Sequence, residues 1–338
     1  MPQPTTGNLK ETTTDIYIPV GDLHINAKKT TPYIIDAAKS LVTTAMKHIN
    51  DYYLEQKCMW PPSIHLVLLG DLVNTARMDE DTCNNLSQLL SDLKQLSKGS
   101  ISILRGNHDN SALHPNNVVW RSLHHHESHP TIYSQPYMKG KILFAPHNYG
   151  GQTMAGTGAK LVFGHFAVPN AQMEYEQFYT KPDVLRDIPE DTYVVLGHLH
   201  TPMEYGNVVF PGSVCPTNWA DNSTQRCAYI IGVNGNTGEV SGVDKVSYPH
   251  MITKTVYSEE DVANEPNVLY RLVVPKLTAD MEQLAKLHNL QISVAKNAAE
   301  RRGTTAQTDE DIIKRACQKR GVPEAPVTRV LRRMKAID

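Results

Sequence analysis

Five short polar clusters, each opening with glycine, constrain this chain more than any other feature of its sequence. They are GDLH at 21–24, GDLVN at 70–74, GNHD at 106–109, GH at 164–165 and GHLH at 197–200. Four of them follow a run typical of β-strands: IHLVLL, ISILR, KLVF and TYVVL. A strand, a glycine turn and then Asp, Asn or His is how an α/β sandwich delivers side chains to one edge of its sheets. The clusters therefore predict one shared polar site.

The first hundred residues alternate strands with amphipathic helices. A strand at 16–20 precedes a helix over about 31–55, and IHLVLLG precedes a helix over about 80–96 that leads to ISILR. Both helices carry apolar residues at spacings of three and four. Parallel strands in this β-α-β-α-β order need helices to cover the sheet.

From about residue 131 the strands become shorter, and Gly, Asn and Pro turns separate them. The strands are KILFAPH, KLVFGH, YVVLGH, NVVFPG and RCAYIIGV. This change predicts a second, more antiparallel sheet packed against the first.

The clusters supply ligands suited to two divalent metal ions. Asp22 and His24 flank one residue at a strand end, and strand alternation points both side chains to the same side. Asp71 is the natural bridging carboxylate, and Asn107 adds a neutral carbonyl ligand that does not repel a phosphate. The second sheet completes the set with His165, His198 and His200. Carboxylates and imidazoles without cysteine suit Mn²⁺, Fe²⁺ or Zn²⁺, and a two-metal site indicates hydrolysis of phosphate esters.

His108 has a different predicted role from the metal ligands. Placed beside the ions, its imidazole can hydrogen-bond the substrate phosphate or protonate the leaving oxygen. We expect Asp109 to hold the other nitrogen of that imidazole.

Composition narrows the class of protein. The chain has 338 residues, a formal net charge of −2 and five cysteines without a C-x-x-C pair. These values are typical of an ordinary globular protein with reduced thiols, which fits the cytoplasm, and any nucleic-acid surface must be local. The sequence predicts no membrane span and no secretory signal, and residues 1–15 read as a frayed, disordered tail.

The remainder of the chain is predicted to form smaller parts after a main domain at 16–247. A small α/β capping region is expected at 248–276, with a helix start at 258–261 and a strand YRLVV. Residues 277–338 are predicted to be helical, and 301–338 hold ten Lys or Arg against five Asp or Glu. This basic segment is either a solvated helical pair or a docking element for a partner or nucleic acid.

The order of the five clusters resembles the calcineurin-like metallophosphoesterase superfamily over roughly residues 16–246. The chain has GNHD in place of GNHE and no Asp-Arg-Gly after Gly70-Asp71, and both features are unlike the Ser/Thr protein phosphatases. The chain is more similar to the SbcD-type recombination nucleases of bacteria and phages. That preference rests on the compact size with a small appendage, on Phe210-Pro211-Gly212-Ser213 after the last histidine cluster, and on the basic C-terminus.

This resemblance implies a four-layer α-β-β-α sandwich and two Mn²⁺ ions. It assigns one ion to Asp22, His24, Asp71 and His200, and the other to Asp71, Asn107, His165 and His198. It also implies that His108 is catalytic, that DNA is degraded as by an exonuclease and endonuclease, and that the chain forms a homodimer with an SbcC-type coiled-coil ATPase. Several members carry His or Asp where this chain has Asn74, and an amide is neither acid nor base.

Two alternatives to a DNA nuclease remain open at this point. One is a metallophosphoesterase acting on small phosphodiesters or nucleotides, and the other is a scaffold without activity. For the nuclease, Arg77 and His114 are candidate DNA contacts because they lie in loops after the metal clusters.

Overall fold

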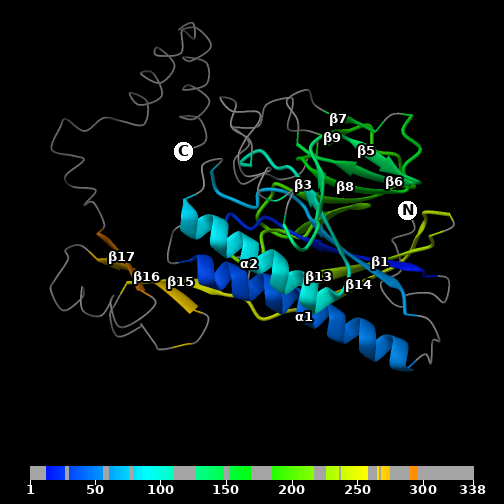
Figure 1. The fold of residues 1–338 in the computed structure, drawn as a ribbon. Coiled ribbons are helices and arrows are strands. Elements are labelled where there is room, and N and C mark those ends of the chain that lie inside the picture. Colours follow the sequence, from blue (N-terminus) through cyan, green and yellow to red (C-terminus); the bar gives the residue numbers. More distant parts are fainter. Residues whose placement is uncertain are drawn as a thin grey trace, which may run out of the picture. The chain divides into compact units, whose positions relative to one another are not determined.

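The structure, a computed structural model, describes residues 13–26, 30–55, 61–75, 79–109, 123, 126–147, 152–154, 156–168, 185–216, 226–235, 237–257, 265, 268–274 and 290–294. The chain divides into two compact units, one of residues 1–254 with 265–269 and one of residues 255–264 with 270–338. The first unit holds the five clusters and is built around two six-stranded sheets (Figure 1).

The first sheet has the strand order β14-β13-β1-β2-β3-β4. Its members are β1 (Asp15–Val20), β2 (Ser63–Leu68), β3 (Ser100–Leu104), β4 (Thr131–Tyr133), β13 (Cys227–Val233) and β14 (Val240–Ser247). Strands β1 to β4 run parallel, whereas β13 pairs antiparallel with both β1 and β14. The parallel strands therefore end at one common edge, where the first three clusters begin.

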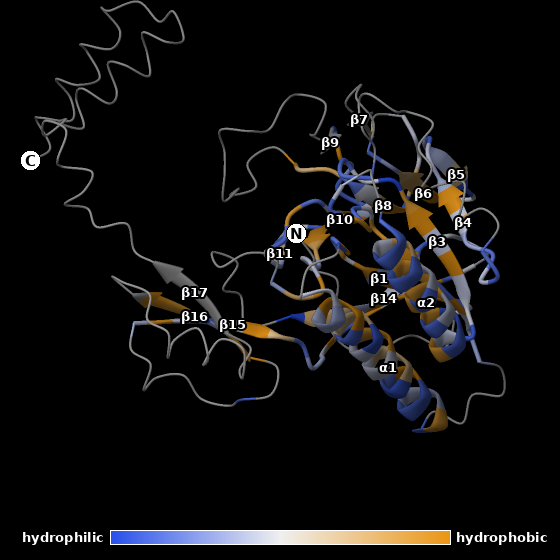
Figure 2. Cartoon of the chain, turned by 60° about the vertical axis from the view of Figure 1, so that its left-hand side comes forward, coloured by the Kyte–Doolittle hydropathy of each residue, from blue (hydrophilic) through white to orange (hydrophobic). Residues whose placement is uncertain are grey.

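Two helices cover the outer face of the first sheet, as the sequence predicts: α1 (Thr31–Glu55) and α2 (Glu80–Ser97). They contact each other, with α1 also on β1, β13 and β14 and α2 on β2 and β3. Helix α2 begins where the Asp79 carboxylate accepts the Thr82 N–H at 2.8 Å, which satisfies a free backbone donor of the first turn. In Figure 2 both helices carry apolar and polar colours, whereas the strands beneath them are largely apolar.

The second sheet has the strand order β11-β12-β10-β8-β6-β5. Its members are β5 (Tyr137–Lys139), β6 (Ile142–Ala145), β8 (Leu161–His165), β10 (Tyr193–Gly197), β11 (Met203–Tyr205) and β12 (Val208–Phe210). The four central strands are parallel, and only the edge strands β5 and β11 are antiparallel to their neighbours. Two further strands, β7 (Gln152–Thr153) and β9 (Leu185–Arg186), form a separate parallel pair.

The predicted arrangement of the second half was wrong in two respects. The second sheet is parallel at its centre and has no more antiparallel pairs than the first, and RCAYIIGV lies in the first sheet as β13, beside β1. Because local alternation reports burial and not the pairing partner, the turn-rich sequence could not reveal either point.

Strand alternation divides the apolar residues of the first unit among three clusters. Ile16 and Ile18 of β1 face the helices, whereas Tyr17 between them faces the second sheet. In β8, Phe163 joins the core between the sheets and Val162 joins a cluster on the outer face of the second sheet. Within the described residues no helix covers that outer face, so only three layers of the expected four-layer sandwich are present there.

The predicted end regions are described only in part. A three-stranded sheet combines β15 (Ile252–Val256), β16 (Val268–Val274) and β17 (Leu290–Val294), and β16 contains the predicted strand YRLVV. The prediction that 277–338 is helical was wrong for β17, which pairs in parallel with β16. Residues 1–12, the predicted helix start at 258–261 and the basic segment 301–338 lie outside the described residues. The predicted disordered tail was wrong for 13–15, since Thr13 is buried and Asp15 begins β1. In the described part of the chain, no helix combines the length and hydropathy needed to cross a bilayer.

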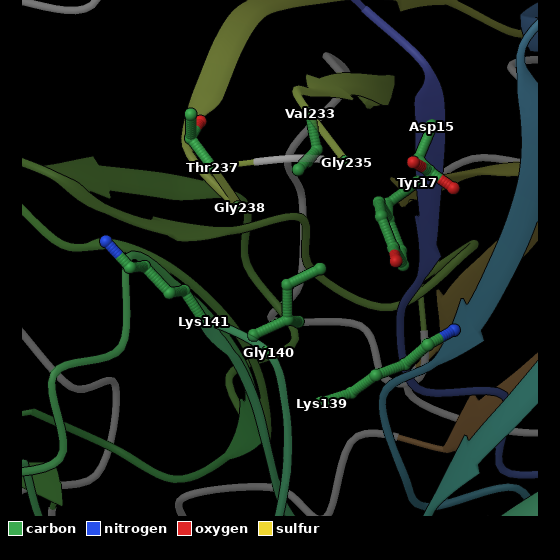
Figure 3. A pocket seen from close by; sticks show the side chains of 10 residues that line it. Asp15, Tyr17, Lys139, Gly140, Lys141, Val233, Gly235, Thr237 and Gly238 are labelled. Atoms are coloured by element: carbon green, nitrogen blue, oxygen red, sulfur yellow. The ribbon is translucent and has the colours of Figure 1, made fainter.

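A cavity of about 310 Å³ opens where β1 begins, at the opposite end of the strands from the clusters (Figure 3). Asp15 and Tyr17 of β1 line it together with Lys139 and Lys141. Since β1 has six residues at about 3.3 Å each, this cavity lies roughly 20 Å from the end of the strand where Asp22 follows. It is therefore separate from the polar site described next.

Candidate metal centre

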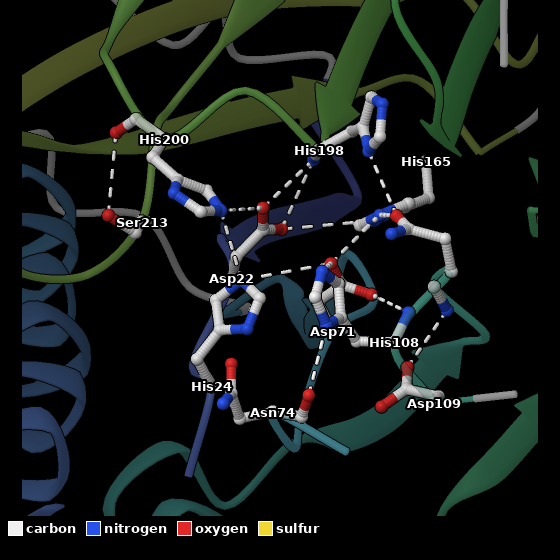
Figure 4. Close-up of polar contacts among 12 residues, drawn as sticks. Asp22, His24, Asp71, Asn74, His108, Asp109, His165, His198, His200 and Ser213 are labelled. Carbon is white, nitrogen blue, oxygen red and sulfur yellow. Dashed lines mark hydrogen bonds and ion pairs between the residues drawn. The ribbon is translucent and has the colours of Figure 1, made fainter. Parts of the chain in front are cut away.

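The predicted site residues converge between the carboxyl ends of the two sheets. Asp22 and His24 follow β1, Asp71 follows β2, and Asn107 and His108 follow β3. From the second sheet come three imidazoles, one at the end of β8 and two just after β10: His165, His198 and His200. Figure 4 shows the two carboxylates with the imidazoles around them. The structure thus brings together all seven predicted ligands and His108.

The backbone at the site is held in unusual conformations. His24, Asp71 and His198 have φ angles of 51°, 48° and 87°, in the left-handed region that residues other than glycine rarely adopt. Each such residue costs roughly 1–3 kcal/mol and persists only where its surroundings hold it. Here the Asp71 carbonyl accepts the N–H groups of Leu23 and His24 at 3.1 and 2.9 Å, which ties the first cluster to the second.

Two cluster glycines are required because other side chains occupy the space beside them. Gly70 has a φ of 109°, and a Cβ there would lie 2.5 Å from Nδ1 of His165. A Cβ on Gly106 would overlap the Asp71 carboxylate and its backbone nitrogen. The glycine at the head of each of these clusters lets two ligand segments approach closely.

The first group of ligand atoms comprises Asp22, His24, Asp71 and His200. Nε2 of His24 lies 3.0 Å from Nε2 of His200 and 3.7 Å from Oδ2 of Asp71. Nε2 of His200 lies 3.7 Å from Oδ2 of Asp22. One ligand atom from each of Asp22, His24 and His200 lies within 4.8 Å of the other two, which is the spacing of a metal-ligand set.

The second group comprises Asp71, Asn107, His165 and His198. The Asn107 carbonyl oxygen lies 2.8 Å from Nε2 of His165 and 2.9 Å from Nδ1 of His198. Nε2 of His165 is also 3.4 Å from Oδ2 of Asp71. The same Asp71 oxygen therefore lies near imidazoles of both groups, which is the position expected of a bridging ligand.

His165 is oriented by its other ring nitrogen. Nδ1 lies 2.8 Å from the carbonyl oxygen of Leu69, and since a carbonyl only accepts, we assign a proton to Nδ1. In neutral His165 the lone pair is then on Nε2, which faces Asn107 and Asp71. A histidine that ligates a metal is held in the same way.

His108 lies at the mouth of the site, with its side chain 43% exposed. Its backbone N–H donates to Oδ1 of Asp71 at 2.8 Å, and its Nε2 lies 4.0 Å from Oδ2 of the same carboxylate. Nδ1 lies 3.0 Å from the carbonyl oxygen of Asn74 and donates to it. Nε2 is therefore the nitrogen directed at the metal centre.

The predicted pairing of Asp109 with His108 was wrong. Asp109 is fully buried, and its Oδ1 accepts the N–H groups of Leu72 and Val73 at 2.9 and 3.3 Å. Its Oδ2 accepts the Gly106 N–H at 2.8 Å. Asp109 thus links the third cluster to the second through hydrogen bonds. The backbone carbonyl of Asn74, and not Asp109, holds Nδ1 of His108. Asn74 therefore contributes to the site through a carbonyl that every residue type carries.

The buried carboxylates and imidazoles shift each other's pKa. Burial raises the pKa of Asp22 well above its usual range, and the nearby Asp71 acts in the same direction. Burial would also raise the pKa of Asp71, but the imidazoles of His165 and His24 outweigh it and lower that pKa. Burial raises the pKa of Asp109 too, with the Asp71 charge adding to the shift.

The two imidazoles that lie nearest Asp71 shift in opposite directions. Burial lowers the pKa of His24 to about 3, against the attraction of Asp71. Burial would lower the pKa of His165 as well, but Asp71 and Asp22 outweigh it and raise the value to about 9. His24 is therefore neutral at pH 7 and can offer a lone pair to a metal ion. His165 is protonated at pH 7 and lies between buried carboxylates, and a cation could take the place of its proton.

Several residues near the site were not predicted to contribute, or are not described. The Arg226 guanidinium is buried and donates to the carbonyl oxygens of His200 and Ser213. Arg226 directly precedes a strand, and no local pattern distinguishes it from a surface arginine. His147 is also buried, with its ring centroid 6.2 Å from that of His165. The candidate DNA contacts Arg77 and His114 lie outside the described residues.

The donor set fits divalent metal ions. Oxygen and imidazole nitrogen donors converge in overlapping sets without cysteine, which suits hard to borderline divalent cations. The buried carboxylates also need a compensating positive charge.

Two opposed sheets that join carboxylates and imidazoles at their carboxyl ends define a metal-dependent phosphoesterase. The family model for the calcineurin-like phosphoesterase domain matches residues 19–202, more than half of the chain, and the chain belongs to this family. Membership implies a hydrolase that acts on phosphoesters with divalent metal ions. A comparison with curated proteins finds no match.

Proposed function

We propose that the chain is an Mn²⁺-dependent DNA nuclease, the SbcD-type subunit of a recombination and repair complex. One observation carries the proposal: Oδ2 of Asp71 lies near imidazoles of two ligand groups, with Nε2 of His108 at 4.0 Å and that side chain exposed. This arrangement serves in-line attack on a phosphodiester that enters from the His108 side.

The residues of the chain have distinct tasks in this reaction. Two divalent metal ions, held by the seven predicted ligands, would supply a nucleophile at neutral pH and stabilise charge on the phosphate. Asp71 is ionised next to the imidazoles, and Asp22 would give up its proton when a cation binds, so that both carboxylates would balance the charge of the ions. His108, when protonated, keeps one N–H on the Asn74 carbonyl and presents the other at Nε2 to a phosphate oxygen or the leaving oxygen.

DNA is favoured over a small phosphodiester by features outside the ligand set. Pro211-Gly212-Ser213 resembles the segment that follows the last histidine cluster in SbcD-type nucleases, and here the Ser213 N–H donates to the His200 carbonyl. We further propose that the C-terminal segment 277–338, with its basic part at 301–338, docks an SbcC-type coiled-coil ATPase and that two copies of the chain assemble.

The test uses the purified full chain with Mn²⁺ and end-labelled linear duplex and single-stranded DNA, alone and with the partner ATPase. We expect cleavage by the wild type, strong loss in His108→Ala, and wild-type cleavage by His129→Asn. His129 is exposed, outside the site and has a φ of 46°, a conformation that Asn tolerates. Cleavage of chromogenic diesters without any cleavage of DNA, even with the ATPase, would contradict the nuclease proposal.

A further inference from the structure

Arg226 is an arginine buried beside the metal centre without pointing into it. It lies directly before β13 and is 1% exposed. Its Nη1 donates to the carbonyl oxygen of Ser213 at 2.7 Å and to that of His200 at 3.1 Å. Hydrogen bonds from a charged donor are about twice as strong as neutral ones. One guanidinium thus joins the segment that follows β12 to a predicted metal ligand.

The His200 carbonyl also accepts hydrogen bonds from Ser213. The Ser213 N–H lies at 3.0 Å and its hydroxyl at 3.4 Å, and Figure 4 shows Ser213 against the backbone of His200. One residue on, the Val214 N–H donates to the carbonyl of Asp22 at 3.3 Å. Residues 212–214 therefore connect the backbones of Asp22 and His200, which belong to the same ligand group but to different sheets.

His200 depends on this backbone support more than His165 does. The His165 side chain is fully buried, and its ring is oriented by the Leu69 carbonyl. The His200 side chain is 26% exposed, so packing restricts it less. Besides the ring contact with His24, the hydrogen bonds to the His200 carbonyl therefore help to direct Nε2 at Asp22 and His24.

We propose that Arg226 is a positioning residue for the ion held by Asp22, His24, Asp71 and His200. It acts through the carbonyls of His200 and Ser213 and does not touch substrate or metal. This inference rests on the proposed two-ion centre and not on DNA as the substrate. It predicts that loss of the guanidinium lowers the affinity for one ion and leaves the affinity for the other unchanged.

The experiment measures Mn²⁺ binding to the metal-free full chain by calorimetry and by electron paramagnetic resonance. Arg226→Met is expected to weaken one of the two ions by about 10- to 100-fold, the usual cost of removing a group that orients a ligand. Tyr248→Phe is the matched control, because the Tyr248 hydroxyl donates to the Val214 carbonyl at 2.8 Å on the same segment. That control should bind both ions like the wild type.

Ligand variants identify which ion is affected. In a His165→Ala background, which impairs the second group, Arg226→Met should still weaken the remaining ion. In a His24→Ala background, which impairs the first group, it should have almost no further effect, since neighbouring effects on one site are not additive. Equal weakening of both ions, or a full effect in the His24→Ala background, would refute the positioning role.

A conservative variant covers the case in which Arg226→Met does not fold by circular dichroism. Arg226→Lys keeps a charge that can reach one of the two carbonyls. We expect it to weaken the same ion to a smaller extent. If the Arg226→Lys variant folds and loses both ions together, Arg226 has a general structural role and does not position one ion. The metal readout is independent of nuclease assays, so failure of the nuclease proposal leaves a distinguishable result.

Discussion

The two sheets contribute different chemistry to the metal centre. Every ligand oxygen comes from clusters that follow the first sheet: Asp22, Asp71 and Asn107. The second sheet contributes imidazoles only: His165, His198 and His200. Negative charge is therefore concentrated on one wall, and neutral or protonated donors face it from the other. The two walls should respond differently to substitution and to pH, which gives four predictions.

The largest effect is expected from the carboxylate shared by both groups. Asp71→Asn removes the charge near His24 and His165 and should lower the affinity for both ions by more than about 100-fold. Replacing a residue that only orients a metal ligand already lowers the affinity by up to about 100-fold. Metal content after Mn²⁺ loading and gel filtration measures the loss. Asp22→Asn is the comparison and should mainly affect the first group; equal loss from both variants would contradict a shared role for Asp71.

The second prediction separates catalysis from metal binding. His108→Ala should lower the rate of phosphodiester cleavage by about 10²- to 10⁴-fold, the usual contribution of a general acid. Its Nε2 lies 4.0 Å from Oδ2 of Asp71 and the seven predicted ligands are present without it, so both ions should remain bound. Rates under single-turnover conditions and metal analysis of the same sample test this. Loss of metal together with activity would make His108 a ligand instead.

The third prediction compares one imidazole from each wall. His24→Ala and His165→Ala should each weaken a different ion, because the two rings face Asp71 from different groups. The effect should be about 10-fold or more for the ion concerned. Two-step calorimetric titrations of both variants, each with Mn²⁺, provide the measurement. If both variants lost the same ion, the division into two groups would be wrong.

The smallest effect concerns pH. In the metal-free protein the pKa of His165 is raised to about 9 and that of Asp22 is also raised, so at pH 7 both hold protons that a cation must displace. Mn²⁺ affinity should therefore increase as pH rises from about 6 towards 9, with protons released on binding. Calorimetry in two buffers of different ionisation enthalpy counts those protons. In His165→Ala the count should fall by about one.

Much of the fold could be predicted where the signal is local. The helix at 31–55 and the strands before the clusters are confirmed because apolar spacing directly reflects which face is buried. The position of β13 beside β1 could not be predicted, since Asp15 pairs with Val233 across more than two hundred residues. When two strands are so far apart in the sequence, neither segment alone shows which strand it pairs with.

The site was predictable to the same degree. Residue type and order were enough to select the seven candidate ligands that the structure brings together, because metals restrict which side chains can bind. The hydrogen bonds that orient them were not, as Asp109 and Arg226 illustrate. Both act on backbone groups, and a sequence does not record which carbonyl or N–H a buried charge will meet.

Because the ligand atoms come from both sheets, a cation bound at this centre would also link the two sheets to each other. The sheets also meet through the apolar core around Tyr17 and Phe163 and through polar contacts such as that of the Tyr229 hydroxyl with Glu204. A ligand that binds only the folded state raises its stability, by about 2.7 kcal/mol at a concentration 100 times its dissociation constant. The protein should therefore lose thermal stability when its metal is chelated, and the first parts to separate should be the carboxyl ends of β1 and β8.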